Sequence, residues 1–311
     1  MAGRTRAAAG TAPPAHAALS QRVAAVVPGR RELILTLSCP DRPGIVARTA
    51  GLIAERSGNI VDSHQFGDPD ASTFFMRIHF AVDDGSTLDS WREGLAGLAR
   101  EFGMTWQLHD AADRPRILVL VSREGHCLND LLYRWSTGAI PADISAIASP
   151  YDDAAAPAAG HGVPFHSLPG VGTEMAVLDR AILDIVERER IELVVLARFM
   201  QVLGSAACRA LHGRAINIHH SFLPSFKGAA PYRQAHDRGV KLIGATAHYV
   251  TEDLDEGPII EQEVARVDHS HSVAELARVG RDVESVALAR AVRWHVEHRV
   301  LLHGHRTVVF R

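Results

Sequence analysis

The spacing of apolar residues divides the chain into two regions with different strand patterns. In the first region, segments with apolar residues at alternate positions predict strands, and segments with apolar residues every three or four positions predict helices. The predicted order is strand (32–39), turn and helix (40–58), two strands (59–66, 74–82), helix (87–103) and strand (104–110). This order, within about 80 residues, is typical of the ferredoxin-like split βαβ arrangement.

Beyond a short linker at 111–115, the predicted strands become continuously apolar, as in parallel strands that are buried on both faces. Strands and helices alternate there, with strands at 116–122, 143–149, 193–197 and 215–220 and helices at 126–138, 174–190 and near 205–212. The alternation predicts an α/β fold with a doubly wound, mainly parallel sheet. We therefore expect two domains, 31–111 and 112–311.

Residues 1–30 follow neither pattern. They contain four arginines but no Asp or Glu, and they are rich in Ala and Pro. We interpret them as a disordered tail. An organelle transit peptide is the alternative, because such peptides are also rich in arginine and poor in acidic residues.

Composition narrows the class of function. The net charge of −3 and the pI of about 6.6 lack the basic character of a nucleic-acid binder. The longest apolar runs, such as 193–197, are far shorter than the roughly 20 residues of a membrane span. Three widely separated cysteines argue against a disulfide framework and favour the reducing cytoplasm. We expect a cytoplasmic enzyme without nucleic-acid or membrane partners.

Candidate chemistry gathers at the end of the strand at 215–220. Asn217 and His219 lie two residues apart and should share one strand face, and His220 should point to the opposite face. A second segment that reads as a strand followed by a loop, 242–260, places Thr246 and His248 on one face. Its acidic loop contains Asp255. Carboxyl ends of strands in open α/β sheets are where ligands bind.

The three residue types complement one another. The amide of Asn217 can donate a hydrogen bond to a developing oxyanion. His219 can donate a proton or stabilise negative charge as an imidazolium. Asp255 can orient and deprotonate a water. Taken one by one, the histidine could be structural and Asp255 could form a turn, so the spacing alone leaves both readings open.

Other chemistries have weaker support. His219, His220 and Asp255 could in principle bind zinc, but the chain lacks the HExxH spacing of zincins, and we expect no metal. Cys127 and Ser221 are candidate nucleophiles; Cys127 begins an apolar helix face and is interpreted as core packing. The chain has no G-x-S-x-G elbow and no G-x-G-x-x-G fingerprint, so we expect no dinucleotide cofactor.

The stretch "NIHHSFLPSFKGAAPY" (217–232), followed by His248 and Asp255, resembles the folate-dependent formyltransferase superfamily. Within it, "HCLNDLLYRW" (126–135), "VVLARFMQVL" (194–203) and "INIHHSFLPSFKGAAPY" are similar to the 10-formyltetrahydrofolate deformylase branch. In the first region, "CPDRPGIVA" and "GNIVDSHQF" agree with that branch and resemble an ACT domain. The resemblance covers about residues 31–311.

The resemblance implies hydrolysis of 10-formyltetrahydrofolate to formate and tetrahydrofolate, which balances one-carbon pools for purine synthesis, with no cofactor. Asn217, His219 and Asp255 would be catalytic, with Thr246 and His248 in support. The residues implied to bind the folate are Phe199, Met200, Gln201, Val202, Leu203, Val250 and Asp253. The ACT resemblance implies an amino-acid effector at an interface between paired copies, hence a homo-oligomer, dimer or tetramer. The residues implied to bind it are Asp41, Gly44, Asn59 and Ile60.

The loop after the first strand of the second region bears on the formyl acceptor. In ribonucleotide transformylases this loop is rich in Gly and Ser and holds a phosphate with backbone N–H groups. Here it is "SREGHCLND" (122–130), in which Glu124 and Asp130 would repel a phosphate. This favours water as acceptor. The rival readings are a formyltransferase with an amine acceptor and a folate or amino-acid sensor without turnover.

Overall fold

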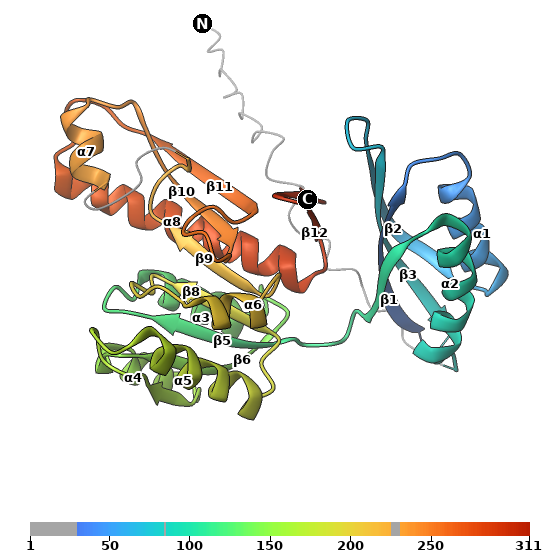
Figure 1. The fold of residues 1–311 in the computed structure, drawn as a ribbon, viewed down its shortest axis with the longest axis horizontal. Coiled ribbons are helices and arrows are strands. Elements are labelled where there is room, and N and C mark those ends of the chain that lie inside the picture. Colours follow the sequence, from blue (N-terminus) through green and yellow to red (C-terminus); the bar gives the residue numbers. More distant parts are fainter. Residues whose placement is uncertain (1–29, 84, 225–230) are drawn as a thin grey trace, which may run out of the picture.

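The computed structural model describes residues 30–83, 85–224 and 231–311, which form two domains joined by the segment after β4 (Figure 1). The predicted tail lies outside the described residues except for Arg30, with which the first strand begins. In the described part of the chain, no helix is both long and apolar enough to cross a membrane.

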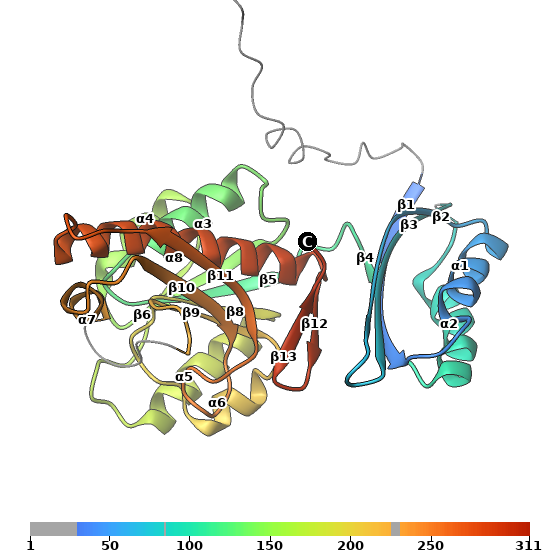
Figure 2. The same ribbon diagram turned by 90° about the horizontal axis from the view of Figure 1, so that it is seen from above.

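The first domain is a four-stranded antiparallel sheet in the order β2-β3-β1-β4. Two helices cover one of its faces (Figure 2). The elements are β1 (Arg30–Pro40), α1 (Ile45–Glu55), β2 (Asn59–Asp68), β3 (Thr73–Asp83), α2 (Leu88–Phe102) and β4 (Thr105–Asp110). The predicted ferredoxin-like order is confirmed. Helix α2 buries Trp91 edge-on against Phe80 of β3, with ring centroids 5.1 Å apart.

The second domain contains a seven-stranded sheet in the order β11-β10-β9-β8-β5-β6-β7. Strands β5 to β9 run parallel, and β10 and β11 are antiparallel to their neighbours. The strands are β5 (Arg116–Val121), β6 (Asp143–Ser149), β7 (Phe165–Ser167), β8 (Leu193–Ala197), β9 (Ala215–His219), β10 (Leu242–Tyr249) and β11 (Ile259–Arg266). The prediction of a mainly parallel sheet is confirmed.

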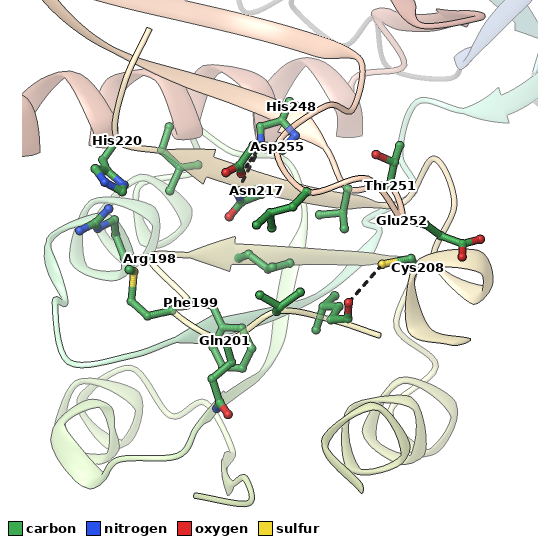
Figure 3. A pocket seen from close by; sticks show the side chains of 17 residues that line it. Arg198, Phe199, Gln201, Cys208, Asn217, His220, His248, Thr251, Glu252 and Asp255 are labelled. Atoms are coloured by element: carbon green, nitrogen blue, oxygen red, sulfur yellow. Dashed lines mark hydrogen bonds and ion pairs between the residues drawn. The ribbon is translucent and has the colours of Figure 1, made fainter. Parts of the chain in front are cut away.

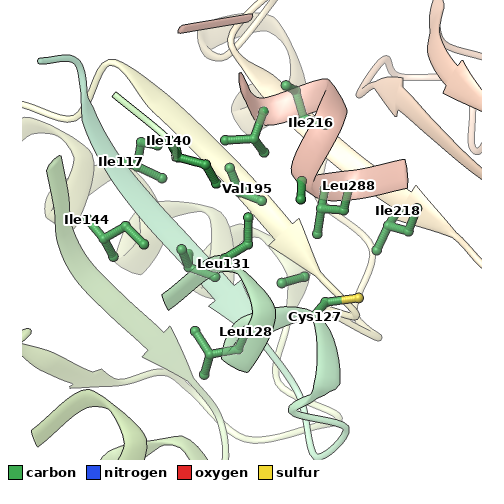
Figure 4. Close-up of a cluster of buried hydrophobic side chains, with 14 of the residues drawn as sticks. Ile117, Cys127, Leu128, Leu131, Ile140, Ile144, Val195, Ile216, Ile218 and Leu288 are labelled. Atoms are coloured by element: carbon green, nitrogen blue, oxygen red, sulfur yellow. The ribbon is translucent and has the colours of Figure 1, made fainter. Parts of the chain in front are cut away.

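Helices cover both faces of this sheet, which is why β5 and β8 can be apolar along their whole length. One hydrophobic core lies between the sheet and α3, α4 and α8; a second lies under α5 and α6. The helices are α3 (His126–Ser136), α4 (Ala155–Gly160), α5 (Met175–Arg188), α6 (Ser205–Ala210), α7 (Pro231–Asp237) and α8 (Val273–Val296). Figure 4 shows Leu131 of α3 and Leu288 of α8 in the first core.

Cys127 also lies in the first core and is completely buried, so its interpretation as packing is confirmed (Figure 4). Burial raises the pKa of its thiol far above the usual range. A thiol without thiolate character is a poor nucleophile.

The chain after residue 260, to which the sequence analysis assigned no element, contains β11, α8 and a hairpin of β12 (Val300–His303) and β13 (Arg306–Val309). The hairpin lies against the first domain, where Arg306 Nη2 is 3.0 Å from Asp68 Oδ2. Buried Arg77 of β3 donates to the carbonyl oxygen of Glu297 at 3.0 and 3.2 Å. The rings of His109 and His298 stack with centroids 3.5 Å apart. The last residues thus join the two domains.

Candidate active site

Two adjacent strands set the positions of four polar side chains. Strands β9 and β10 pair antiparallel, with Asn217 opposite His248 and His219 opposite Thr246. Residues opposite each other, and residues two apart on one strand, share a face of a sheet. All four side chains therefore gather at the carboxyl end of β9.

The loop after β10 brings Asp255 back to these strands. The amide of Tyr249 donates to the carbonyl oxygen of Pro258 at 2.9 Å, which closes the loop. Gly257 packs so tightly against the carbonyl of Tyr249 that a Cβ atom there would overlap it. Asp255 adopts a left-handed backbone conformation with φ 57°, which Asp tolerates better than most residues. The sequence of this loop thus fixes where the carboxylate lies.

Asp255 lies between two imidazoles. Its Oδ2 is 3.2 Å from His219 Nδ1, and its Oδ1 is 3.6 Å from His248 Nε2. These contacts, led by the hydrogen bond from His219, hold the pKa of the Asp255 carboxyl well below its usual range despite partial burial. The carboxylate is therefore ionised throughout the neutral pH range.

Hydrogen bonds also orient His248 and Asn217. His248 Nδ1 lies 2.9 Å from the carbonyl oxygen of Tyr249 and must donate to it. Nε2 accepts from Asn217 Nδ2, 3.3 Å away, when the imidazole is neutral, and donates to Asp255 Oδ1 when the ring is protonated. An amide nitrogen has two hydrogens, so Asn217 retains a second N–H for a substrate oxygen.

Thr246 has a supporting position rather than a place in the pocket. It is completely buried, and its hydroxyl donates to the carbonyl oxygen of Ser221 at 2.9 Å. Thr246 Oγ1 in turn accepts from the amide of Leu223 at 3.0 Å. Thr246 therefore holds the chain where it leaves β9. The continuation of that loop, 225–230, lies outside the described residues.

A pocket of about 180 Å³ opens beside these groups (Figure 3). Of the residues predicted to be catalytic or to bind folate, those lining it are Phe199, Met200, Gln201, Val202, Leu203, Asn217, His248, Val250 and Asp255. His219 borders the pocket only through Asp255. Asp253, on the same loop as Asp255, does not line it. Met200 is 64% exposed and offers an apolar surface at the mouth.

The segment after β8 that lines the pocket is held from behind by two polar side chains. Ser122 Oγ accepts from the amide of Met200 at 3.0 Å. The buried carboxylate of Asp179 on α5 accepts from the amide of Gly204 at 2.8 Å and from that of Ala207 at 3.3 Å. Neither residue carries a sequence signal, because each acts on a backbone group distant in the chain.

The sequence analysis placed His220 wrongly. The lining residues that it did not name as pocket residues are Leu196, Arg198, Cys208, Ile218, Thr251, Glu252 and Leu254. Strand β9 ends at His219, so the alternation of faces stops there. His220 instead lines the pocket, with its ring stacked on that of His219 at a centroid distance of 4.9 Å. Figure 3 shows His220 beside Arg198 at one end of the pocket.

Behind this end lies a buried charge network centred on Glu284 of α8, which is 1% exposed. Its carboxylate is 2.8 Å from His126 Nε2, accepts from the Tyr232 hydroxyl at 2.5 Å, and is 3.4 Å from Arg198 Nε. Arg198 also pairs with Glu124 at 2.8 Å. Arg198 adopts a left-handed conformation with φ 63°, which carries its side chain to this position.

The same network contains three atoms that could hold a metal ion, from His126, Cys127 and Glu284, all within 4.8 Å of one another. Arg198 already compensates the Glu284 carboxylate, and a metal would need the thiolate that burial disfavours. In this structure the Glu284 carboxylate is instead engaged by His126, Tyr232 and Arg198.

The four residues predicted to bind an effector lie at opposite ends of the first domain. Asp41 and Gly44 follow β1, near Thr73 of β3, whereas Asn59 pairs with Ala81 at the other end of β3. Eight residues along β3 separate the two places by roughly 27 Å. Within one chain these residues do not form a single site.

Comparison with known proteins agrees with both domains. A family model described as "Formyl transferase" matches residues 115–292, and one described as "ACT domain" matches residues 33–90. A curated protein named formyltetrahydrofolate deformylase from Corynebacterium sp. (strain P-1) is 45% identical over 279 residues, covering 89% of this chain and 98% of the relative.

Solved structures give the same picture. A formyltetrahydrofolate deformylase from Burkholderia mallei is 50% identical, covers 90% of this chain and 100% of its own, and superposes with a TM-score of 0.86. A glycinamide ribonucleotide transformylase from Symbiobacterium toebii is 31% identical, covers 64% of this chain and 95% of its own, and gives a TM-score of 0.60. The transformylase thus matches nearly all of its own chain but a smaller part of this one than the deformylase does.

Proposed function

The chain belongs to the formyltetrahydrofolate deformylase family of hydrolases, and on that premise we propose that it converts 10-formyltetrahydrofolate and water into formate and tetrahydrofolate. The observation that carries the proposal is the ionised Asp255 carboxylate, held between His219 and His248 at the edge of a pocket that Asn217 also lines.

Each of these residues has a role in attack on the formyl carbon. Asp255 activates the attacking water by accepting a hydrogen bond from it. Asn217 donates its second N–H to the formyl oxygen as that oxygen becomes negative. His219 donates to Asp255 through Nδ1, so it would act as an imidazolium, and its buried Nε2 has no hydrogen-bond partner among the described residues. This supports a role for Nε2–H as donor to the same oxyanion. The tetrahedral intermediate then expels N10 as N10 is protonated.

The folate is proposed to lie along the segment after β8. Met200 and Val202 present exposed apolar surface, and Leu254 does so from the opposite loop. Flat heteroaromatic rings bind such surfaces, with backbone groups supplying the polar contacts. Asp253 stays a prediction as a folate-binding residue; a contact from it would need the loop to move.

Charges near His220 support water rather than a phosphorylated amine as the acceptor. The carboxylates of Glu124 and Glu284 lie on either side of Arg198 and neutralise the cation nearest this end of the pocket. A phosphate beside Arg198 would meet two carboxylates that already pair with its guanidinium. Since a dedicated amine acceptor usually needs an anchoring group, this arrangement disfavours the transferase alternative.

The decisive experiment is to incubate the purified protein with 10-formyltetrahydrofolate and no added amine, and to assay formate and tetrahydrofolate. Equal amounts of both products would support hydrolysis. Absence of formate, with candidate amino-acid effectors also tested, would contradict it. Formyl transfer to an added amine would then favour the transferase, and tight folate binding without product would favour a sensor.

Two wider roles follow as proposals. The formate and tetrahydrofolate released would balance the one-carbon pools that purine synthesis draws on. The ACT domain would bind an amino-acid effector between two copies of the chain, since the predicted effector residues lie about 27 Å apart in one copy. Two copies packed side by side in opposite directions could bring Asp41 of one near Asn59 of the other.

A further inference from the structure

Hydrolysis at this site needs a group that accepts a proton from the attacking water. An amine acceptor attacks as a free base, but water is a weak nucleophile until it loses a proton to a general base. Asp255 is stabilised as an anion by His219 and His248. It can accept a hydrogen bond from water, but protonating it would cost the contacts with both imidazoles.

His220 is a second imidazole at the pocket wall, besides that of His248. It lines the same pocket as Asn217, His248 and Asp255. Its ring centroid is 4.9 Å from that of His219, whose Nδ1 is 3.2 Å from Asp255. His220 and Asp255 therefore face the same pocket, and the Asp255 charge acts on the His220 imidazole, so a water in the pocket can contact both.

The surroundings of His220 determine its protonation state. Charged and titratable groups face it from each element packed against it, namely Arg198 after β8, His219 on β9, Tyr232 on α7, Asp255 after β10 and Glu284 on α8. Burial, Arg198 and His219 together lower the pKa of His220 to about 4, against the opposing effect of Glu284 and Asp255. The imidazole is thus neutral at physiological pH and can accept a proton.

We propose that His220 is a catalytic base, which takes a proton from the attacking water while Asp255 orients that water. This inference rests on the proposed function. The O–H bond breaks as the O–C bond forms, and the electrons of the formyl C=O bond move to its oxygen. When the tetrahedral intermediate collapses, the C–N10 bond electrons go to N10, which receives the proton held by His220. Formic acid leaves and releases its own proton to solvent.

The test compares two nucleophiles in His220→Asn and the wild type. Hydroxylamine is a free base at neutral pH and needs no deprotonation before it attacks, whereas water does. We expect hydrolysis to fall by about 10²- to 10³-fold in the variant, while formation of formohydroxamate from added hydroxylamine falls by less than about 10-fold.

Two controls make the result decisive. His236→Asn removes an exposed imidazole from the neighbouring helix α7 and should leave both rates unchanged. Tetrahydrofolate binding and the thermal midpoint verify that His220→Asn is folded; His220→Gln serves if it is not. Hydrolysis within about threefold of wild type, or equal losses with both nucleophiles, would overturn the inference. A wild type that releases no formate would instead refute the proposed function.

Discussion

At the scale of single residues, the site depends on one carboxylate whose charge is fixed by its neighbours. Replacing Asp255 with Asn keeps the shape but removes the charge that His219 and His248 contact. We expect kcat to fall by about 10²- to 10⁴-fold, with little change in folate affinity, because the apolar lining is retained. Steady-state kinetics and binding of tetrahydrofolate would separate the two effects.

The matched control is Asp184→Asn, on the exposed side of α5, which should be indistinguishable from wild type. Turnover by Asp255→Asn within a few-fold of wild type would show that the carboxylate is dispensable and that the proposed mechanism is wrong.

Sequence reasoning reached some site residues and missed others for a physical reason. Asn217 and His219 were predictable because the carboxyl end of a strand in a parallel sheet is where ligands bind. Strand β10 runs antiparallel to β9, so His248 and Asp255 reach the same place only because the strands pair and the loop after β10 folds back. The pairing of Arg198 with Glu284 could not be predicted. The two residues are 86 positions apart in the chain (284 − 198), and they meet only because α8 packs across the sheet. The predicted direction of the His220 side chain was wrong because β9 ends at His219, and the alternation of faces ends with it.

At the scale of elements, the loop between β10 and β11 acts as a rigid carrier for Asp255. Gly257→Ala would drive a Cβ atom into the carbonyl of Tyr249, so the loop must shift. We expect a loss of about 1–3 kcal/mol of stability and a clear drop in kcat. Gly170→Ala is the control, since a Cβ atom there meets nothing within 4 Å. Denaturant unfolding and kinetics with both variants would test this; an active Gly257→Ala would show that the loop adapts.

The position of the segment after β8 depends on the Asp179 carboxylate, which accepts hydrogen bonds from its backbone. Asp179→Ala would leave the buried amides of Gly204 and Ala207 without their acceptor, at about 1–3 kcal/mol for the pair of bonds. Because this segment lines the pocket but does no chemistry, we expect KM for the folate to rise more than kcat falls. Asp184→Ala, on the same helix but exposed, is the comparison. Equal effects on kcat and KM would argue against a purely positioning role.

The order of elements was predictable wherever the apolar pattern was strong, whether continuous as in β5 and β8 or periodic as in α2. The elements after residue 260, for which no prediction was made, have a weaker apolar pattern. Edge strand β11 and the hairpin strands are only partly buried, and α8 carries charged side chains along its length. Their places in the fold come from packing against other elements, which periodicity does not encode.

At the scale of the whole molecule, partly buried histidines should make the protein sensitive to mild acid. Burial lowers the pKa of His220 and His295 to about 4 and that of His298 to about 3, below the ordinary value of 6.5. Between about pH 6.5 and 4, the unfolded chain therefore binds more protons than the folded one, so the free energy of unfolding decreases as pH falls. Urea unfolding at pH 7, 6 and 5 should show this decline.

His298→Asn removes one of these groups at the contact between the domains. The variant should show a shallower dependence of stability on pH over the same range, whatever its stability at pH 7. The exposed His236 serves as the comparison, since His236→Asn should not change the slope. A slope unaffected by His298→Asn would mean that other groups govern the acid response.

The hairpin at the end of the chain has a consequence for how such proteins can be shortened or recombined. The formyl transferase family match ends at residue 292, before the hairpin, and the ACT match lies entirely upstream of the catalytic domain. Yet Arg306 contacts Asp68, and Phe310 stacks on His64, across more than 200 positions. The first domain and the C-terminal segment with the hairpin, which flank the catalytic domain in the sequence, thus pack against each other. Deleting the ACT domain alone would leave the hairpin without its packing partner. The ACT domain and the hairpin should therefore be lost, gained or exchanged together.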